Sequence, residues 1–500
     1  MPSATSQRAS ADATSNKAVQ LVYLCAVQSA VNDSCKELKQ ISYTSGNPDN
    51  DHHLNSFQKF LCKLAQVCDT AKGGDTITAL VALKTANGPG YLFASNNRKE
   101  LELKGTMKFL TELLEYVGKN PLGLGEKAMS KQILWRALEF GFPKVEYYIK
   151  RVAALIEECI ELSRQLDGHS QSVVLQQLKH VHDRAKFSHD MLAGENARNK
   201  FLRDCEILIR AIHALRESSF MTAMYERTHD SNTDISRSWC ELRHYLGRLH
   251  SYRQAAECIY KASRDWPEMF KGFTVNFISS SRPLKLSLPK PHPGSGQVIQ
   301  VAFPDINMDE YHDHLDVLRL YSLDENLLNE LPQKSMKLVM HCEVLLHSFL
   351  VRSGSVDADE YWNDSMFIAT SKPPCRLCHY YFSDIDNDFQ VQSSHMNVYP
   401  KWRLPDLCEG QDSDAAKLRE ELLDEIIEKM QHDTLSIVKE KVPQGKRNDS
   451  RTDSRTMESV LSHSGRVHEF GYNSGRFSTA SMGYGRSNDN GDCWENIEQR

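Results

Sequence analysis

The chain holds 500 residues, which at about 150 residues per domain predicts about three structural units. Hydrophobic residues make up 40% of it, a share that excludes a wholly disordered protein. No stretch approaches the roughly 20 apolar residues of a membrane-spanning helix, so we expect no membrane partner. The 60 basic and 66 acidic residues give a net charge of −6, which disfavours a globally basic nucleic-acid binder and leaves room for a local basic groove.

Cysteine usage and the amino terminus bear on the compartment. The 13 cysteines are too few for a disulfide scaffold, and their number is odd. The amino terminus lacks the apolar core of a secretion signal, so we expect reduced thiols in an intracellular protein, either cytoplasmic or nuclear. Residues 1–16 are rich in Ser, Ala and Thr, and we predict that they are disordered.

Residues 17–124 are predicted to form helices around a β-hairpin. Apolar residues alternate with others over 77–83, residues 87–90 form an Asn-Gly-Pro-Gly turn, and the extended pattern resumes over 91–94. Residues 125–270 differ, because their apolar residues recur at steps of three and four. That pattern predicts a large all-α region of helices packed on one another.

Residues 271–442 are predicted to be mixed. The runs 284–288 and 299–303 alternate and suggest a second hairpin, a helix is expected over 309–331, and an amphipathic helix over 415–438 closes this part. Residues 443–500 are dominated by Ser, Gly, Asn, Asp and Arg. They hold too few apolar residues to offset the entropy of ordering, which predicts a disordered tail.

Two motifs in the mixed region carry chemistry. His341-Cys342-Glu343 opens one apolar helix, and the run from Pro374 to Cys378, Pro-Cys-Arg-Leu-Cys, opens another, with a strand-like run over 366–369 between them. Cys375 and Cys378 are three residues apart and share a helix face, while the positive end of a helix dipole stabilises thiolates. A redox pair and a structural zinc knuckle using Cys408 with His379 or His395 are alternatives for the Cys-x-x-Cys run alone.

The ordered combination favours a catalytic zinc site. His341, Cys375 and Cys378 would supply three ligands, which leaves the fourth tetrahedral position for water. Glu343 is the candidate base that takes a proton from that water and returns it to substrate and leaving group. Because residues two apart on a helix diverge, His341 is expected at the mouth of its helix, ahead of the regular turns.

H-x-E followed by P-C-x-x-C resembles the signature of the zinc-dependent cytidine deaminase superfamily. The words over 339–346, 368–378 and 394–402 are similar to its OTT-like deaminase branch, which is found in fungal chromosomes and bacterial toxin systems. Members commonly have Ala where this chain has Cys342. The resemblance implies an α/β fold, with a three-layer α/β/α core around a mixed, roughly five-stranded sheet. It also implies zinc ligands at His341, Cys375 and Cys378 and a proton shuttle at Glu343.

Two hairpins compete to supply the first strands of that sheet. We favour the early one, which would make the all-α region an insertion in the deaminase core and would place Asn96 or Asn97 in the pocket. Free-nucleoside deaminases have a ribose-contacting Asn at a similar place. The alternative uses the hairpin over 284–303. His395 is a further candidate for substrate contact, and a packed or solvated histidine is the alternative there.

The sequence thus predicts a zinc-dependent hydrolytic deaminase acting on a cytosine- or adenine-type base, either in a free nucleotide or in single-stranded nucleic acid. The competing hypothesis is a catalytically silent deaminase-fold module that recognises a nucleotide, RNA or a protein partner. Intact positions 341, 343, 375 and 378 favour the enzyme. The motifs leave open which base is used and the oligomeric state, since pocket loops set base choice.

Overall fold

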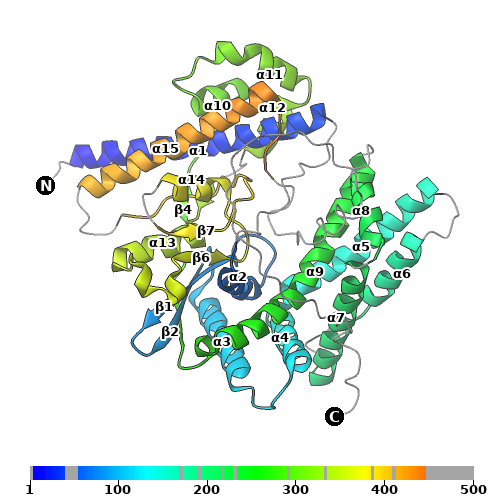
Figure 1. The fold of residues 1–500 in the computed structure, drawn as a ribbon. Coiled ribbons are helices and arrows are strands. Elements are labelled where there is room, and N and C mark those ends of the chain that lie inside the picture. The colour runs from blue at the N-terminus through cyan, green and yellow to red at the C-terminus, as the bar shows by residue number, and fades with distance from the viewer. Residues whose placement is uncertain are drawn as a thin grey trace, which may run out of the picture.

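The computed structural model describes residues 4–39, 54–167, 173–188, 191, 194–216, 218–228, 233–289, 293–331, 335–384, 388–407 and 413–445 (Figure 1). The predicted tail therefore lies outside the described residues from 446 onward. Helix α1 (Ala4–Leu38) begins inside the segment 1–16, for which we predicted disorder. Among the described helices, none is both long enough and apolar enough to cross a membrane.

A mixed five-stranded sheet forms the centre of the α/β part, in the order β3-β2-β1-β6-β7. Strands β1 (Thr78–Thr85) and β2 (Gly88–Ser95) form the predicted hairpin. Strand β1 also pairs antiparallel with β6 (Phe367–Thr370), which in turn lies parallel to β7 (Gln390–Val391). The early hairpin thus belongs to the same sheet as the strand between the two motifs, as we favoured.

Alternation along the strands divides the sheet into two buried faces. Leu80, Tyr91 and Phe367 belong to the core shared with the helical region, whereas their neighbours Val81, Leu92 and Ile368 belong to the core shared with the motif helices. Successive side chains of a strand point to opposite faces, so both faces of this sheet are covered. The predicted three-layer α/β/α core with a large helical region is confirmed.

One face carries the two motif helices, α13 (Cys342–Ser353) and α14 (Arg376–Asp384). Helix α1 packs against α15 (Ser413–Glu440), and the two long helices cross the outside of this layer side by side (Figure 1). Lys17 Nζ on α1 forms ion pairs of 2.8 Å with both Glu420 and Asp424 on α15.

The other face carries α2 (Ser56–Cys68) and the helical region. This region lies between β2 and β3 (Thr274–Ile278) in the chain, yet these two strands pair in parallel. It is therefore an insertion in the sheet, as predicted, although β3 itself was missed. Its helices lie at the bottom centre and on the right of Figure 1. They are α3 (Glu100–Lys119), α4 (Glu126–Phe140), α5 (Phe142–Asp167), α6 (Val173–Ala185), α7 (Glu195–Arg216), α8 (Phe220–Thr228) and α9 (Thr233–Asp265).

The second predicted hairpin is wrong. Strand β4 (Leu284–Leu286) pairs with β5 (Met336–Leu338), just before the first motif. Residues 299–302 belong to helix α10 (Ser295–Ala302), in which Val298, Ile299 and Ala302 are buried. Three alternating apolar residues are too few to separate a strand from a helix. Here the buried residues are spaced as on one face of a helix.

The helix predicted over 309–331 is also interrupted. The structure has a short 3-10 helix (Met308–Tyr311), then α11 (His312–Arg319) and α12 (Leu323–Glu330). Ser322 adopts the left-handed conformation with φ of 60°, which breaks the helix between the last two. The bend lets Leu318 and Leu323 both reach the core that covers α1.

Candidate metal centre

The first motif sits at the start of α13. His341 is the N-cap residue, with extended backbone dihedrals (φ −69°, ψ 149°), and Leu345 N–H donates to the His341 carbonyl at 2.9 Å. The side chain of an N-cap residue is free of the helical spacing. His341 therefore lies at the mouth of its helix, as the spacing with Glu343 required.

The second motif sits at the start of α14. Proline suits the first position of a helix, and we expected Pro374 there; the helix instead begins at Arg376, two residues later. His379 N–H donates to the Cys375 carbonyl at 2.9 Å, which places Cys375 in the first turn with Cys378 one turn on. The segment after β7 holds this start, because Arg376 N–H donates to Asn397 O at 3.0 Å and His395 N–H to Pro374 O at 3.2 Å.

The three predicted ligands converge. His341 Nδ1 lies 3.5 Å from Cys375 Sγ and 3.3 Å from Cys378 Sγ, and the two sulfurs are 3.5 Å apart. Zn–S bonds of about 2.3 Å and Zn–N bonds of about 2.0–2.1 Å imply ligand separations of about 3.5–3.8 Å in a tetrahedral site. Among the described residues, this is the one group of three His, Cys, Asp or Glu side chains close enough to hold a metal ion. The donor set and its spacing fit Zn²⁺.

The electrostatics of the cluster suit a cation. Burial opposes ionisation of Cys375, but the hydrogen bond from Cys378 and the nearby His341 outweigh it and hold the pKa of the Cys375 thiol well below its ordinary value. Burial and the neighbouring Cys375 raise the pKa of Cys378 well above the ordinary value. Burial likewise opposes protonation of His341, yet Cys375 raises its pKa. The cluster thus concentrates negative charge on sulfur, and a divalent cation bound there would take the place of its protons.

Glu343 lies in the first turn of α13 beside these ligands, with its side chain 4% exposed. The thiol of Cys342 donates to Glu343 Oε2 at 3.3 Å, and a hydrogen bond also links Glu343 to Cys378. Burial and, to a smaller extent, the nearby Glu343 raise the pKa of Cys342 well above its ordinary value, so this thiol remains a donor. The carboxylate is therefore held in a dry position next to the three ligands.

The two asparagines predicted to line the pocket differ in position. Asn96 is buried, its Oδ1 accepts the Cys342 N–H at 2.7 Å, and its Nδ2 donates to Gly74 O at 2.9 Å. It therefore reaches the start of the His341 helix, 246 residues away in the chain. Asn97 is exposed and donates to Asp75 at 3.2 Å.

His395 lies over the start of α14, buried, with its Nδ1 accepting the Asn397 N–H at 3.0 Å. Tyr399 lies between the two histidines, with its ring centroid 5.7 Å from that of His395 and 6.5 Å from that of His341. Tyr399 was not among the residues that we predicted to line the site. The available signal was an aromatic residue inside the family-like segment 394–402, but the turn that brings it back to His341 is not visible in the sequence.

A buried polar network at the same end of the sheet was also missed. The Asp69 carboxylate, at the C-cap of α2, accepts from Thr76 at 2.6 Å and from Ser371 at 3.4 Å, and it forms an ion pair with Lys144 of α5. Ser371 follows β6 directly, two residues before the second motif's prolines. The helical region thus contributes a charged side chain close to the segment that carries the cysteines.

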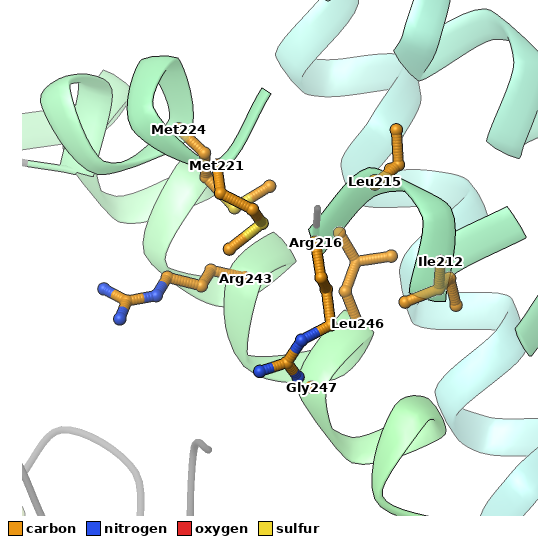
Figure 2. A pocket seen from close by; sticks show the side chains of 8 residues that line it. All are labelled: Ile212, Leu215, Arg216, Met221, Met224, Arg243, Leu246 and Gly247. Atoms are coloured by element: carbon orange, nitrogen blue, oxygen red, sulfur yellow. The ribbon is translucent and has the colours of Figure 1, made fainter. Parts of the chain in front are cut away.

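Two hollows in the described part of the chain have linings without any of the three candidate metal ligands. One, of about 500 Å³, opens to solvent between α14 and α15 and is lined by His379, Met396 and His432 among others. The other lies where α7, α8 and α9 meet, with Arg216 and Arg243 beside Met221 and Met224 (Figure 2). Its cavity of about 20 Å³ holds a water molecule or two at most, so it excludes a nucleobase.

Comparison with known proteins agrees with the geometry of the metal centre. Residues 340–406 match the model of the OTT_1508-like deaminase family. No curated protein and no solved structure matches the chain. The matched segment holds His341, Glu343, Cys375, Cys378 and His395, but not the early hairpin with Asn96. A deaminase-family domain is therefore present in this chain, and its matched part is the segment that carries the candidate metal ligands.

Proposed function

We propose that the chain is a zinc-dependent hydrolytic deaminase of the OTT-like branch, acting on a cytosine- or adenine-type base in a free nucleotide or in single-stranded nucleic acid. The observation that carries the proposal is the convergence of one imidazole nitrogen and two sulfurs within 3.5 Å, with a buried carboxylate beside them. Three protein ligands leave one tetrahedral position open, which is typical of a catalytic zinc site.

His341, Cys375 and Cys378 would hold the zinc, which when bound supplies a Lewis acid that acidifies water at its open position. The Glu343 carboxylate would carry the two protons of the attacking water in turn, the first to the ring nitrogen and the second to the amino group, which then leaves as ammonia. The thiol of Cys342 and the buried surroundings keep that carboxylate oriented and dry. Asn96, whose amide caps the His341 helix, and His395 are proposed to border the substrate.

The test is a deamination screen of free nucleosides, nucleotides, single-stranded DNA and RNA with metal-replete protein. Glu343→Gln should keep zinc and fold while turnover falls by about 10²–10⁴-fold, because the shuttle is removed and the ligands remain. Arg352→Gln, an exposed charge change near the other end of α13, is the matched control and should leave turnover unchanged.

Each outcome separates one part of the proposal from another. Loss of zinc in Glu343→Gln would mean that Glu343 is a ligand, and retained turnover would refute the mechanism. If the zinc-loaded protein deaminates none of these substrates, the silent binding module becomes the better hypothesis.

A further inference from the structure

Two buried cations lie on α5 and α9, helices that pack against each other. Lys144, in the first turn of α5, is 2% exposed, and Arg248, on α9, is 3% exposed. Tyr148 lies one turn after Lys144, and Arg248 donates a hydrogen bond to it. Burial opposes ionisation of Tyr148, but Arg248 and Lys144 outweigh it and lower its pKa. Tyr252, one turn after Arg248, has its hydroxyl against Gly141, where an added Cβ would lie 3.0 Å from it. The four side chains therefore surround the amino-terminal end of α5.

The charges in this cluster do not balance. The buried carboxylates of the described residues are Asp69, Glu206 and Glu343, and only Asp69 lies beside these two cations. Glu206 bonds Trp135 on α4, and Glu343 lies at the metal centre. One carboxylate thus serves two buried cations, and an unpaired buried charge costs several kcal/mol.

Hydrogen-bond donors in the cluster are left over as well. A guanidinium has five donors, yet Arg248 Nε has no partner, and Tyr148 is the acceptor that its side chain finds. The Lys144 ammonium has three donors, and among the described residues its ion-pair partner is the carboxylate of Asp69. The nearby Arg98 differs, because the Cys68 carbonyl and the hydroxyls of Thr70, Thr78, Ser95 and Thr106 accept from it.

We propose that Lys144, Tyr148, Arg248 and Tyr252 form a binding site for a small tetrahedral oxyanion, a phosphate group that is either inorganic phosphate or part of a nucleotide. Such an anion accepts from the guanidinium, the ammonium and both phenol hydroxyls, and it neutralises the excess positive charge. The positive end of the α5 dipole adds to the attraction. The site does not depend on the deaminase reaction, since it lies on the opposite face of the sheet from the motif helices.

Equilibrium dialysis of the full chain tests the proposal with three probes: inorganic phosphate, sulfate and a nucleoside monophosphate. We expect one phosphate per chain, competed by sulfate, and a rise of the unfolding temperature with phosphate concentration. Tighter binding of the nucleotide than of phosphate would identify a nucleotide as the source. Absence of binding by all three probes to the unaltered protein would overturn the proposal, whatever the variants do.

Variants assign the site. Arg248→Met should weaken phosphate binding at least about tenfold, the effect of losing a charge-assisted hydrogen bond. Arg248→Lys, which keeps the charge, should retain part of the affinity and serves if the Met variant does not fold. Arg243→Met is the matched control on the same helix, since Arg243 lines the separate hollow in Figure 2. Equal weakening in Arg243→Met would place the anion elsewhere. A phenolate absorbance at neutral pH that Tyr148→Phe removes, without anion binding, would show that Tyr148 itself balances the charge.

Discussion

The two faces of the sheet are covered by segments of different kinds. On one face, α13 and α14 are short, and their first turns carry the four residues of the metal centre. On the other face, the helical region is long and supplies apolar side chains to a continuous core, with Lys144 and Arg248 buried inside it. Metal binding requires particular residue types at fixed positions in the helices of the first face. Packing requires of the helices on the second face only that apolar residues recur with helical spacing.

The two faces meet at one end of the sheet. Ser371, which follows β6, donates to Asp69, and Asp69 forms its ion pair with Lys144 of the helical region. Asn96, which follows β2, caps the His341 helix from the same end. Through these contacts the insertion and the hairpin both reach the segments that carry the candidate metal ligands.

The largest effect is expected from removing the hairpin and the insertion together. A chain of residues 271–442 lacks β1 and β2, and β1 is the strand that joins β6 to the rest of the sheet. The exposed edge of β6 and two uncovered apolar faces should cause aggregation. Size-exclusion chromatography and zinc content are the measurements, with residues 17–442 as the matched longer chain. A soluble, cooperatively folding, zinc-loaded 271–442 chain would show that the sheet closes without β1 and β2.

The sequence predicted which three side chains converge at the candidate metal centre, but it predicted the rest of the fold unevenly. His341, Cys375 and Cys378 were predictable because zinc demands those residue types at helix starts. The hairpin over 77–95 was predictable because an Asn-Gly-Pro-Gly turn separates two alternating runs. Strand β3 was missed because its five residues hold too few alternations. The predictions near residues 299 and 322 were wrong because short apolar patterns fit both a strand and a helix. The pairing of Asp69 with Lys144 was out of reach, since no local rule joins residues from separate helices.

Loss of the metal is the next largest effect. Cys375→Ser with Cys378→Ser should reduce bound zinc from about one per chain to none, because hydroxyls replace the thiolates. Residues around 340–400 should then become more accessible to hydrogen exchange, whereas the helical region should keep its protection. Cys240→Ser, on α9, is the control for loss of a thiol outside the metal centre. Full zinc retention in the double variant would refute the site.

Breaking the link between the two faces should cost less. Asp69→Asn leaves Lys144 buried without its counter-charge, and removal of one partner of a buried pair costs about 3–5 kcal/mol of unfolding free energy. Burial opposes ionisation of Asp69, but Lys144 and Lys372 outweigh it and hold its pKa below the ordinary value. That contribution is present above the unfolded pKa of about 4 and is lost as the pH falls through the folded pKa.

Urea unfolding between pH 3 and pH 7 measures this contribution. Asp69→Asn should flatten the acid limb of the stability profile, and Asp75→Asn, an exposed neighbour that accepts from Asn97, should leave it unchanged. A stability profile that Asp69→Asn does not alter would mean that the pair with Lys144 does not couple the two faces.

The smallest effect compares the two asparagines after β2. Asn96→Ala leaves the buried Cys342 N–H and the Gly74 carbonyl without their partners and should cost about 1–2 kcal/mol of unfolding free energy, while the exposed Asn97→Ala should stay within about 0.5 kcal/mol. Asn96→Asp is the matched variant, because its carboxylate still accepts from Cys342 N–H at the positive end of α13 but no longer donates to Gly74. It should therefore recover much of the lost stability, which the urea midpoint measures.

Zinc content should stay near one per chain in all three asparagine variants, and at least one of them should raise the KM for the base that the screen identifies. Equal stability of Asn96→Ala and Asn97→Ala would show that the hairpin does not position the His341 helix, so the two faces would be joined through Asp69 alone.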